Sequence, residues 1–273
     1  MISGTTRLIA HLGYPIEGFK APMIYNPYFE AVGIDARVMP MGVRAEDYPT
    51  VLPANVLGAL VTMPHKITTA SLVDELSPTA AIAGSCNAIL LRPDGSLLGD
   101  MFDGEGFVRG ALRKGCVIRG ARALVIGSRG VGSAIAASLA AAGVAALSLF
   151  DERPVAAEQL GARLKRHYPT LDVQVGTRDP AGFEIVVNAT PLGMKEGDPL
   201  PMDVSRITPG SFVGEVVMKS EMTPLLAAAK ARDCCVQVGT DMLYEMIPAY
   251  LEFSAFRPPL PSICELYRNC VID

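Results

Sequence analysis

Short apolar runs separated by glycine- and proline-marked turns fill the first hundred residues of the chain. Runs at residues 7–12, 36–39 and 57–62 are typical of buried β-strands, whereas residues 22–31 and 64–76 show the pattern of helices. Strands and helices that alternate in this way predict an α/β lobe at the N-terminus.

A second series of apolar runs follows a predicted helix over residues 104–114, which ends at Gly115. Six candidate strands, separated by helices, lie at 121–126, 146–150, 172–175, 185–188, 211–217 and 235–238. This alternation predicts a mainly parallel sheet, and a last helix over 241–253 is expected to pack back on the first lobe. We therefore expect an α/β fold of two lobes, in segments 1–104, 105–238 and 239–273.

The composition is that of a compact globular protein. The chain has 273 residues, of which 50% are hydrophobic and 19% charged, and this length favours two lobes. The net charge of −4 is spread along the chain without long runs of one sign. Because nucleic-acid binding needs clustered lysines and arginines, we expect no nucleic-acid partner.

The cysteines predict neither a metal site nor a disulfide framework. Zinc sites and structural disulfides in small domains are recognised by paired, regularly spaced cysteines. Only three histidines accompany the six cysteines, which lack Cys-x-x-Cys spacing: Cys86, Cys116, Cys234, Cys235, Cys264 and Cys270. We therefore expect no bound metal.

One segment has the length of a membrane span. Residues 131–150 carry no charge over twenty positions. They are rich in alanine and serine, are interrupted by Gly143 and end in a β-type run, which favours a buried helix followed by a strand. Since the first ten residues also show no export signal, we expect a cytoplasmic protein with no membrane partner.

A glycine-rich loop joins a predicted strand to a predicted helix. The strand that ends at Ile126 runs into Gly127-Ser128-Arg129-Gly130-Val131-Gly132, and an alanine-rich helix follows. In this order of elements, backbone N–H groups and the helix N-terminus bind a pyrophosphate. Arg129 takes the middle place of Gly-x-Gly-x-x-Gly, where it either turns outward toward a phosphate or obstructs the cofactor. A plain strand-to-helix turn is the alternative.

Two acidic residues indicate which dinucleotide would bind. Asp151 and Glu152 follow the next predicted strand, and Asp151 lies nineteen residues after Gly132. A carboxylate at this place accepts hydrogen bonds from a free ribose 2′-hydroxyl and repels a 2′-phosphate. The sequence therefore predicts a dinucleotide cofactor, with NAD favoured over NADP. Arg153 leaves pairing with a phosphate open.

Seven ordered motifs carry a family resemblance. They are GYPI at 13–16, VTMPHK at 61–66, AGSCN at 83–87, DGEG at 103–106, NATPLGM at 188–194, TPLL at 223–226 and GTDML at 239–243. With them, the chain resembles the shikimate and quinate dehydrogenases over nearly its whole length. The resemblance implies an N-terminal substrate-binding lobe, a Rossmann dinucleotide-binding lobe and NAD(P)-linked oxidation of a ring hydroxyl on a small cyclic substrate.

The resemblance also implies roles for individual residues. Lys66 and Asp103 fall on the catalytic positions, with Lys66 as the proton acceptor and Asp103 as its orienting partner. Asn87 falls on a ligand of a substrate hydroxyl, and Thr62 on a substrate-contacting threonine. Further positions would lie along the cofactor: Thr190, Pro191 and Gly239.

The chain departs from the family where the substrate carboxylate would bind. The hydroxyl side chains of the family are replaced by Phe19, Ala21 and Met218, and a glutamine position holds Met246. Lys20 offers a cation in their place. Other family positions are altered as well: Leu60, Met101 and Phe102. The expected substrate is therefore shikimate, quinate or a less polar cyclic analogue.

Plainer interpretations of the same residues stay open. Lys66 can simply begin a solvated helix face, and Asp103 can cap the helix that follows it. With Arg129 in the glycine loop, a sensor that binds a dinucleotide or metabolite without turnover is the alternative function. The expected assembly is a monomer or a homodimer.

Overall fold

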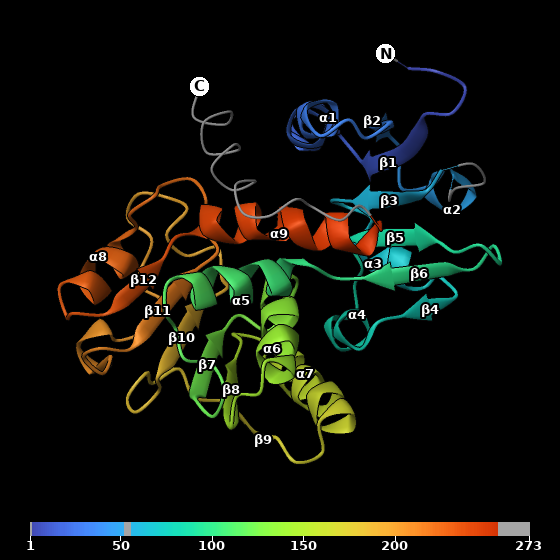
Figure 1. The fold of residues 1–273 in the computed structure, drawn as a ribbon. Helices are drawn as coiled ribbons and strands as arrows, with labels where there is room; N and C mark the ends of the chain where they lie inside the picture. The colour runs from blue at the N-terminus through green and yellow to red at the C-terminus, as the bar shows by residue number, and fades with distance from the viewer. Residues whose placement is uncertain (1, 52–55, 256–273) are drawn as a thin grey trace. The chain divides into compact units, whose positions relative to one another are not determined.

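The computed structural model describes residues 2–51 and 56–255, and the chain divides into two compact units. The first unit comprises Met1–Met101 and Tyr250–Asp273, and the second comprises Phe102–Ala249 (Figure 1). Cys264 and Cys270 lie outside the described residues. The segment boundaries expected at residues 104 and 238 stay a prediction.

The first unit contains a six-stranded sheet in the order β2-β1-β3-β5-β6-β4. β1 pairs in parallel with β2 and β3, whereas β5 is antiparallel to β3 and β6. The strands are β1 (Arg7–Gly13), β2 (Ala36–Gly42), β3 (Gly58–Val61), β4 (Glu75–Leu76), β5 (Ala88–Leu91) and β6 (Leu97–Asp100). The helices are α1 (Ala21–Ala31), α2 (Tyr48–Val51), α3 (Lys66–Ala70) and α4 (Pro78–Ala83).

Part of this unit differs from the prediction. The helix expected over 64–76 is a five-residue α3, and the chain then enters β4. Ser77 caps a separate helix, α4, by accepting a 3.1 Å hydrogen bond from the N–H of Ala80. The hairpin of β5 and β6 was not predicted, because four-residue runs around Asp94 and Gly95 give too short a periodic signal.

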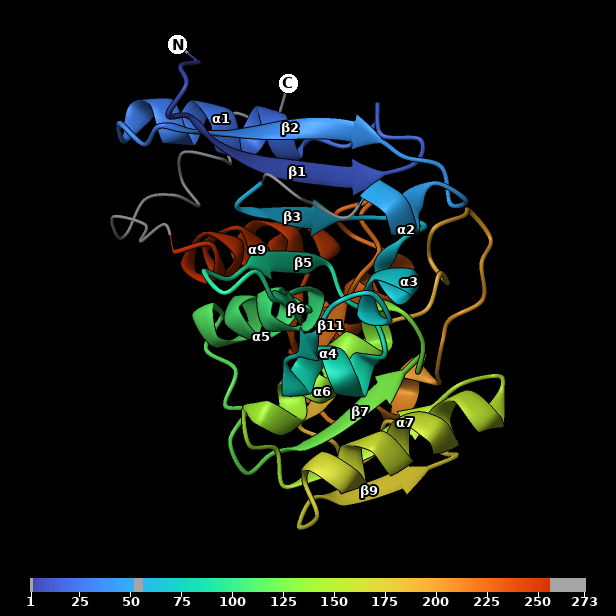
Figure 2. The same cartoon turned by 90° about the vertical axis from the view of Figure 1, so that its right-hand side faces the viewer.

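Side chains on both faces of this sheet hold its helices. Ala10, Leu12 and Val61 belong to a buried cluster that also includes Tyr48 of α2. On α1, the side-chain amide of Asn26 donates to the carbonyl of Val38 at 3.0 Å and accepts from its N–H at 2.7 Å. This pair of bonds fastens α1 along β2, and the two elements lie side by side in Figure 2.

The second unit contains a parallel six-stranded sheet in the order β12-β11-β10-β7-β8-β9. All six predicted strands are present: β7 (Arg122–Ile126), β8 (Ala146–Phe150), β9 (Asp172–Val175), β10 (Ile185–Asn188), β11 (Phe212–Glu215) and β12 (Cys235–Gln237). The strand order reverses between β7 and β10, which is the switch point of a Rossmann sheet. The predicted α/β fold with a Rossmann lobe is confirmed.

Helices cover both faces of the second sheet. They are α5 (Asp103–Arg113), α6 (Val131–Ala141), α7 (Pro154–His167), η1 (Val204–Arg206), α8 (Pro224–Lys230) and α9 (Gly239–Phe253). Val213 of β11 packs in one cluster with Leu225 and Leu226 of α8, whereas a Cβ on Gly214 would lie 2.4 Å from the Phe107 ring of α5. Successive residues of a strand face opposite sides, so α5 and α8 cover opposite faces.

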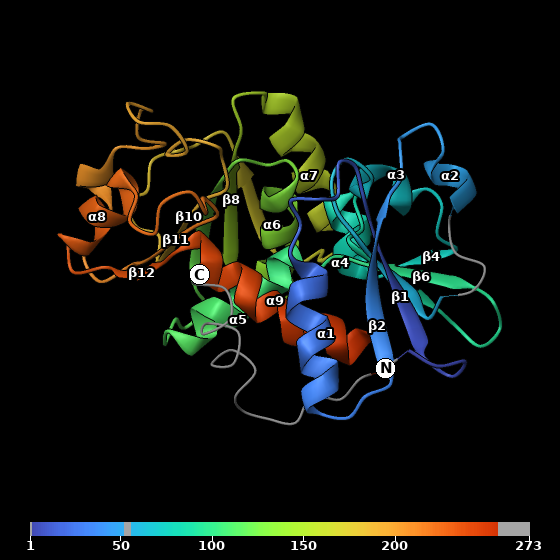
Figure 3. The same ribbon diagram turned by 90° about the horizontal axis from the view of Figure 1, so that it is seen from above.

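Helix α9 runs beside α5, as Figure 3 shows, and a Cβ on Gly106 would lie 2.4 Å from the carbonyl oxygen of Met242. The last residues of α9 belong to the first unit, where the Tyr250 hydroxyl donates a 3.2 Å hydrogen bond to the carbonyl of Asn87. Residues 131–150 form α6 and β8, as predicted. None of the described helices has the length and apolar character needed to cross a bilayer.

Candidate active site

The glycine loop lies at the switch point of the second sheet, between β7 and α6. A Cβ on Gly127 would lie 2.7 Å from the carbonyl oxygen of Ala189, and one on Gly132 only 1.9 Å from that of Gly127. Both positions therefore require glycine. At Gly130, which has a φ of 49°, a Cβ would meet nothing within 4 Å. The loop thus closes tightly on itself and leaves space above Gly130, which fits a dinucleotide phosphate.

Arg129 is exposed, so its side chain leaves the interior of the loop free. The neighbouring Ser128 is buried, and its backbone N–H donates a 2.9 Å hydrogen bond to Oδ2 of Asp151. Oδ1 of Asp151 accepts a 3.0 Å bond from the N–H of Arg153. Both carboxylate oxygens therefore hold backbone at the carboxyl end of β8, and Glu152 between these residues is exposed.

A buried asparagine organises the turn that follows β10. Oδ1 of Asn188 accepts from the N–H of Thr190 at 3.1 Å and from its hydroxyl at 2.7 Å. Nδ2 of Asn188 donates to the carbonyl of Leu192 at 3.0 Å. A Cβ on Gly132 would lie 3.1 Å from the Cβ of Ala189, so the segment after β10 lies beside the glycine loop. Thr190 and the exposed Pro191 are therefore held next to this loop.

Three further predicted residues lie in the second unit, one after β11 and two in α9: Met218, Gly239 and Met246. Gly239 begins α9, and a Cβ on it would lie 2.3 Å from the carbonyl oxygen of Val217. This close approach brings Gly239 next to Met218, whose side chain is half exposed. Met246 lies farther along α9, where its backbone N–H is 3.0 Å from the position of a Cβ on Gly106.

Asp103 is the first residue of α5, and it is buried. The glycine after it permits close helix packing, because a Cβ on Gly104 would lie 2.0 Å from the carbonyl oxygen of Ala134 in α6. Gly106 plays the same part toward α9. The DGEG motif therefore places a buried carboxylate on a helix that is clamped between two others.

Lys66, Thr62 and Asn87 lie in the first unit around the carboxyl end of β3. The N–H of Thr62 donates to the carbonyl of Leu12 at 2.9 Å. Lys66 begins α3 and is half buried, and its carbonyl accepts a 2.8 Å bond from the N–H of Cys86. Asn87 follows directly and is buried, so the fold brings the segments of Lys66 and Asn87 together. Lys66 and Asp103 belong to different units, and their pairing stays a prediction.

The residues expected to bind the far end of the substrate precede or begin α1. Lys20 is exposed at the start of this helix, and Ala21 is half buried. The ring of Phe19 meets His11 of β1 edge to face, with 5.9 Å between ring centres. His11 is buried, and its Nδ1 has no hydrogen-bond partner among residues 2–51 and 56–255.

Three buried polar residues were not singled out from the sequence. Asn188 was treated only as part of a motif, and His11 as a strand residue. Burial lowers the pKa of His11 from 6.5 to about 4. Glu215 at the end of β11 is fully buried, and burial raises its pKa. Asn188 and Glu215 are the last residues of apolar strands, and this position was the available signal for them, because such ends meet at one edge of a parallel sheet.

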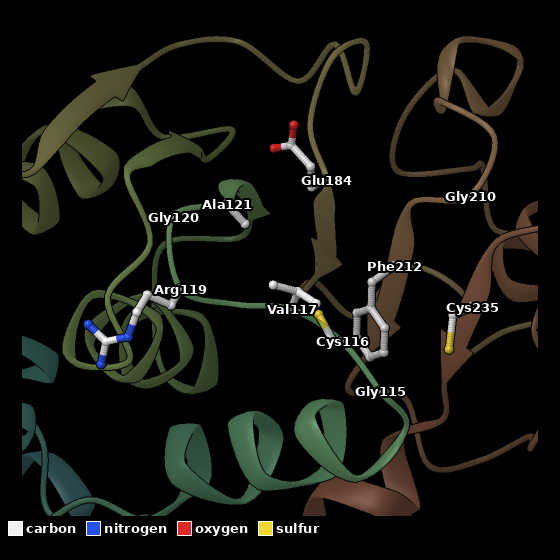
Figure 4. A pocket seen from close by; sticks show the side chains of 10 residues that line it. All are labelled: Gly115, Cys116, Val117, Arg119, Gly120, Ala121, Glu184, Gly210, Phe212 and Cys235. Carbon is white, nitrogen blue, oxygen red and sulfur yellow. The ribbon is translucent and has the colours of Figure 1, made fainter.

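One cavity of the second unit contains none of the predicted site residues. It has a volume of about 430 Å³ and is shown in Figure 4. Its walls include Ala121, Glu184 and Cys235, which lie at the amino ends of β7, β10 and β12. The glycine loop follows the carboxyl end of β7, so this cavity is at the opposite edge of the sheet.

Comparison with known proteins gives consistent matches. Residues 12–89 match the shikimate dehydrogenase substrate binding domain. Over 265 residues the chain is 33% identical to the shikimate dehydrogenase (NADP(+)) of Paramagnetospirillum magneticum, a match that covers 94% of this chain and 96% of the relative. It is 35% identical over 270 residues to that of Rubrobacter xylanophilus, with 94% of each chain covered.

A solved structure matches equally well. Shikimate 5-dehydrogenase from Listeria monocytogenes, in complex with shikimate and NAD, superposes with a TM-score of 0.89 at 27% identity. The match covers 97% of this chain and 98% of that one. The two lobes therefore have a counterpart throughout their length.

The prediction that NAD is favoured over NADP is wrong. The relatives from Paramagnetospirillum and Rubrobacter both carry NADP(+) in their names, and so do other relatives at 31% and 32% identity. The prediction assumed that the carboxylate of Asp151 is available to a ribose hydroxyl. In the structure its two oxygens also accept the N–H groups of Ser128 and Arg153, so an acid at this position has a structural role besides any contact with a ribose.

Proposed function

The chain belongs to the shikimate dehydrogenase family, and on this premise we propose that it oxidises a ring hydroxyl of shikimate or a closely related cyclic polyol, with NADP as the hydride acceptor. The chain is an NAD(P)-dependent oxidoreductase of the CH–OH type, and the resemblance seen in its seven motifs is confirmed. The non-catalytic sensor is not favoured.

The observation that carries the proposal is the retention of Lys66 beside Asn87. The 2.8 Å bond from the N–H of Cys86 to the carbonyl of Lys66 joins their two segments. The backbone of Asn87 is held on three sides, since its N–H donates to Asp100 and its carbonyl accepts from Val61 and Tyr250. An amide and an amine held in this way can bind neighbouring hydroxyls of one ring.

Oxidation of the ring hydroxyl to a ketone removes a hydride from the carbon and a proton from the oxygen. A bound dinucleotide would supply the acceptor for the hydride that leaves the carbinol carbon. In our proposal the neutral amine of Lys66 accepts the proton of the same hydroxyl, and the carboxylate of Asp103 orients that amine or hydroxyl. Asn87 binds the adjacent hydroxyl and so fixes which ring position reacts.

The substrate end opposite the reacting hydroxyl is the part where this chain differs. Phe19, Ala21 and Met218 supply no hydroxyl, while Lys20 supplies an exposed cation at the start of α1. We propose that a carboxylate on the substrate pairs with Lys20. A substrate without a carboxylate would lose little at this point, because the apolar side chains leave no donor unpaired.

The test is NADP reduction with shikimate, quinate and less polar cyclic alcohols by the protein and by Lys66→Ala. We expect Lys66→Ala to lower kcat by at least about a hundredfold, as for loss of a general base. Lys165→Ala, on the exposed side of α7, is the matched control and should keep full turnover. Turnover that survives Lys66→Ala would refute the assignment. The cytoplasmic location and the monomer or homodimer state stay predictions.

A further inference from the structure

His11 of β1 is a buried histidine whose neighbours in the sheet are all apolar. β1 lies between β2 and β3, as Figure 2 shows, and His11 is in register with Pro40 on one side and Leu60 on the other. Paired residues of adjacent strands share a face of the sheet, and so do residues two apart on one strand, here Ile9 and Gly13. None of these four residues has a side chain that can form a hydrogen bond.

The imidazole of His11 is neutral and lacks a partner. His11 is only 5% exposed, and its Nδ1 has no hydrogen-bond partner in the part of the chain that the structure describes. Burial lowers the pKa of His11 from 6.5 to about 4, so the ring carries no charge at pH 7. A neutral imidazole has one N–H donor and one acceptor nitrogen. Because buried polar groups are nearly always hydrogen-bonded, an unpaired one indicates a position that contacts a ligand.

Two residues that were predicted to contact the substrate flank His11. The ring of Phe19 meets the imidazole edge to face, with 5.9 Å between ring centres. Farther along β1, a Cβ on Gly13 would lie 2.4 Å from Cγ2 of Thr62. The side chain of Thr62 therefore lies over Gly13, on the same face of the sheet as His11. Thr62 belongs to the motif that carries Lys66, so this face leads from the imidazole to the predicted proton acceptor.

The spacing along this face suits a small ring. Two residues of a strand span about 7 Å, which is the distance from His11 to the position beside Thr62. A six-membered ring can bridge such a distance with its substituents. A ring whose reacting hydroxyl lies at Lys66 would therefore present its far end to His11.

We propose that the imidazole N–H of His11 donates a hydrogen bond to a hydroxyl group at the far end of the substrate ring, and that His11 thereby selects cyclic polyols that carry this hydroxyl. The proposal rests on the proposed function, since it concerns the substrate of the same site. A neutral donor among apolar side chains suits an uncharged oxygen, because a carboxylate there would be buried without a counter-charge. Lys20, the exposed residue after Phe19, is the cation for a carboxylate.

The first test observes the imidazole directly. The chain has three histidines, so a long-range proton–nitrogen NMR spectrum of the whole protein shows three rings, which His11→Gln and His167→Gln assign. Quinate is the probe and shikimate the comparison, because quinate carries a hydroxyl on the carbon that bears its carboxylate and shikimate does not. At pH 7 we expect a neutral His11 ring whose signals shift more with quinate than with shikimate. A charged ring, or signals that move with neither compound, would overturn the proposal.

The second test separates substrate binding from packing by steady-state kinetics with NADP. His11→Leu fills the site with an apolar side chain but removes the N–H. We expect the KM for quinate to rise at least about tenfold, as for loss of one hydrogen bond, while kcat stays within about twofold. His11→Gln retains a side-chain N–H and should restore most of the affinity. A fall in kcat at constant KM, or equal effects of the two substitutions, would indicate a packing role and contradict the proposal.

His167→Gln, at the exposed end of α7, is the matched control and should change neither KM nor kcat. The two proposals fail in different ways. A shift of the His11 signals with quinate, without turnover of any substrate, would refute only the proposed function. Turnover that depends on Lys66 but is the same in His11→Leu and the wild type would refute only the role of His11.

Discussion

Thr223 donates a 2.9 Å hydrogen bond to the carboxyl group of Glu215, which is fully buried at the end of β11. The same hydroxyl oxygen caps α8 by accepting from the N–H of Leu226 at 3.3 Å. Glu215 pairs in register with Asn188, which organises the turn after β10. The buried carboxyl group of Glu215 therefore joins the end of β11 to the start of α8, next to the turn after β10.

Glu215 should make stability fall as the pH rises. Burial raises its pKa above the value of the unfolded chain, so its contribution is complete below about pH 4.5 and is lost as the pH rises through the folded pKa. Glu215→Gln, which cannot ionise, should therefore gain stability relative to the wild type between pH 5 and pH 8. Urea unfolding of both proteins at the two pH values measures the difference in their free energies of unfolding. For Glu158→Gln, on an exposed face of α7, the difference in unfolding free energy from the wild type should be the same at both pH values.

His11 should have the opposite effect and make the stability of the fold decrease as the pH falls below neutrality. Its folded pKa of about 4 lies below the ordinary 6.5, so its stability contribution is present above pH 6.5 and is lost as the pH falls through 4. A shift of this size corresponds to roughly 3 kcal/mol. His11→Leu should lose correspondingly less stability from pH 7 to pH 4. If His167→Gln, at an exposed site, gave the same change, burial of His11 would not be the cause.

Gly104→Ala should separate α5 from α6. The new Cβ would lie 2.0 Å from the backbone carbonyl of Ala134, which cannot move without shifting the helix. We expect a loss of about 1–3 kcal/mol or more, measured as a lower Tm and as weaker NADP binding. Gly18→Ala, where the Cβ meets nothing within 4 Å, is the control. Equal changes in Tm would contradict the packing role of Gly104.

Asn188→Ala should loosen the turn that carries Thr190. Three hydrogen bonds disappear, which leaves the N–H and hydroxyl of Thr190 and the carbonyl of Leu192 without this partner. Each such group that stays buried and unpaired costs about 1–3 kcal/mol of stability. Stability and dinucleotide affinity should both fall, as measured by urea unfolding and titration. Gln174→Ala removes an exposed amide on β9 and should change neither. Unchanged affinity in Asn188→Ala would show that the turn does not contact the cofactor.

Asp103→Asn should lower turnover without unfolding the protein. The amide keeps the size of the carboxyl group at the start of α5 but not its charge, so the orientation of the amine is lost. We expect kcat to fall by about a hundredfold or more. Glu105→Gln, two residues on, removes only a partly exposed pair with Arg109 and should retain turnover. Similar losses in both variants would contradict the role of Asp103.

The fold could be predicted because its signals are local. All six strands of the second sheet are apolar runs bounded by turns, and each was found near its predicted position. The hairpin of β5 and β6 was missed, since two four-residue strands gain their stability from pairing with β3 and not from their own pattern. The break between α3 and α4 was missed for the same reason.

For the candidate site, too, local patterns in the sequence predicted one part of the arrangement, and the tertiary structure decided the other. The sequence alone predicted the strands of the second sheet, the glycine loop and the motifs that contain Lys66, Asn87 and Asp103, because each pattern is carried by neighbours in the chain. Only the tertiary structure decided that Asp151 also holds the glycine loop, since its partner Ser128 lies 23 residues away in the chain. It also decided that His11 and Glu215 are buried, because burial depends on elements distant in the chain that cover them.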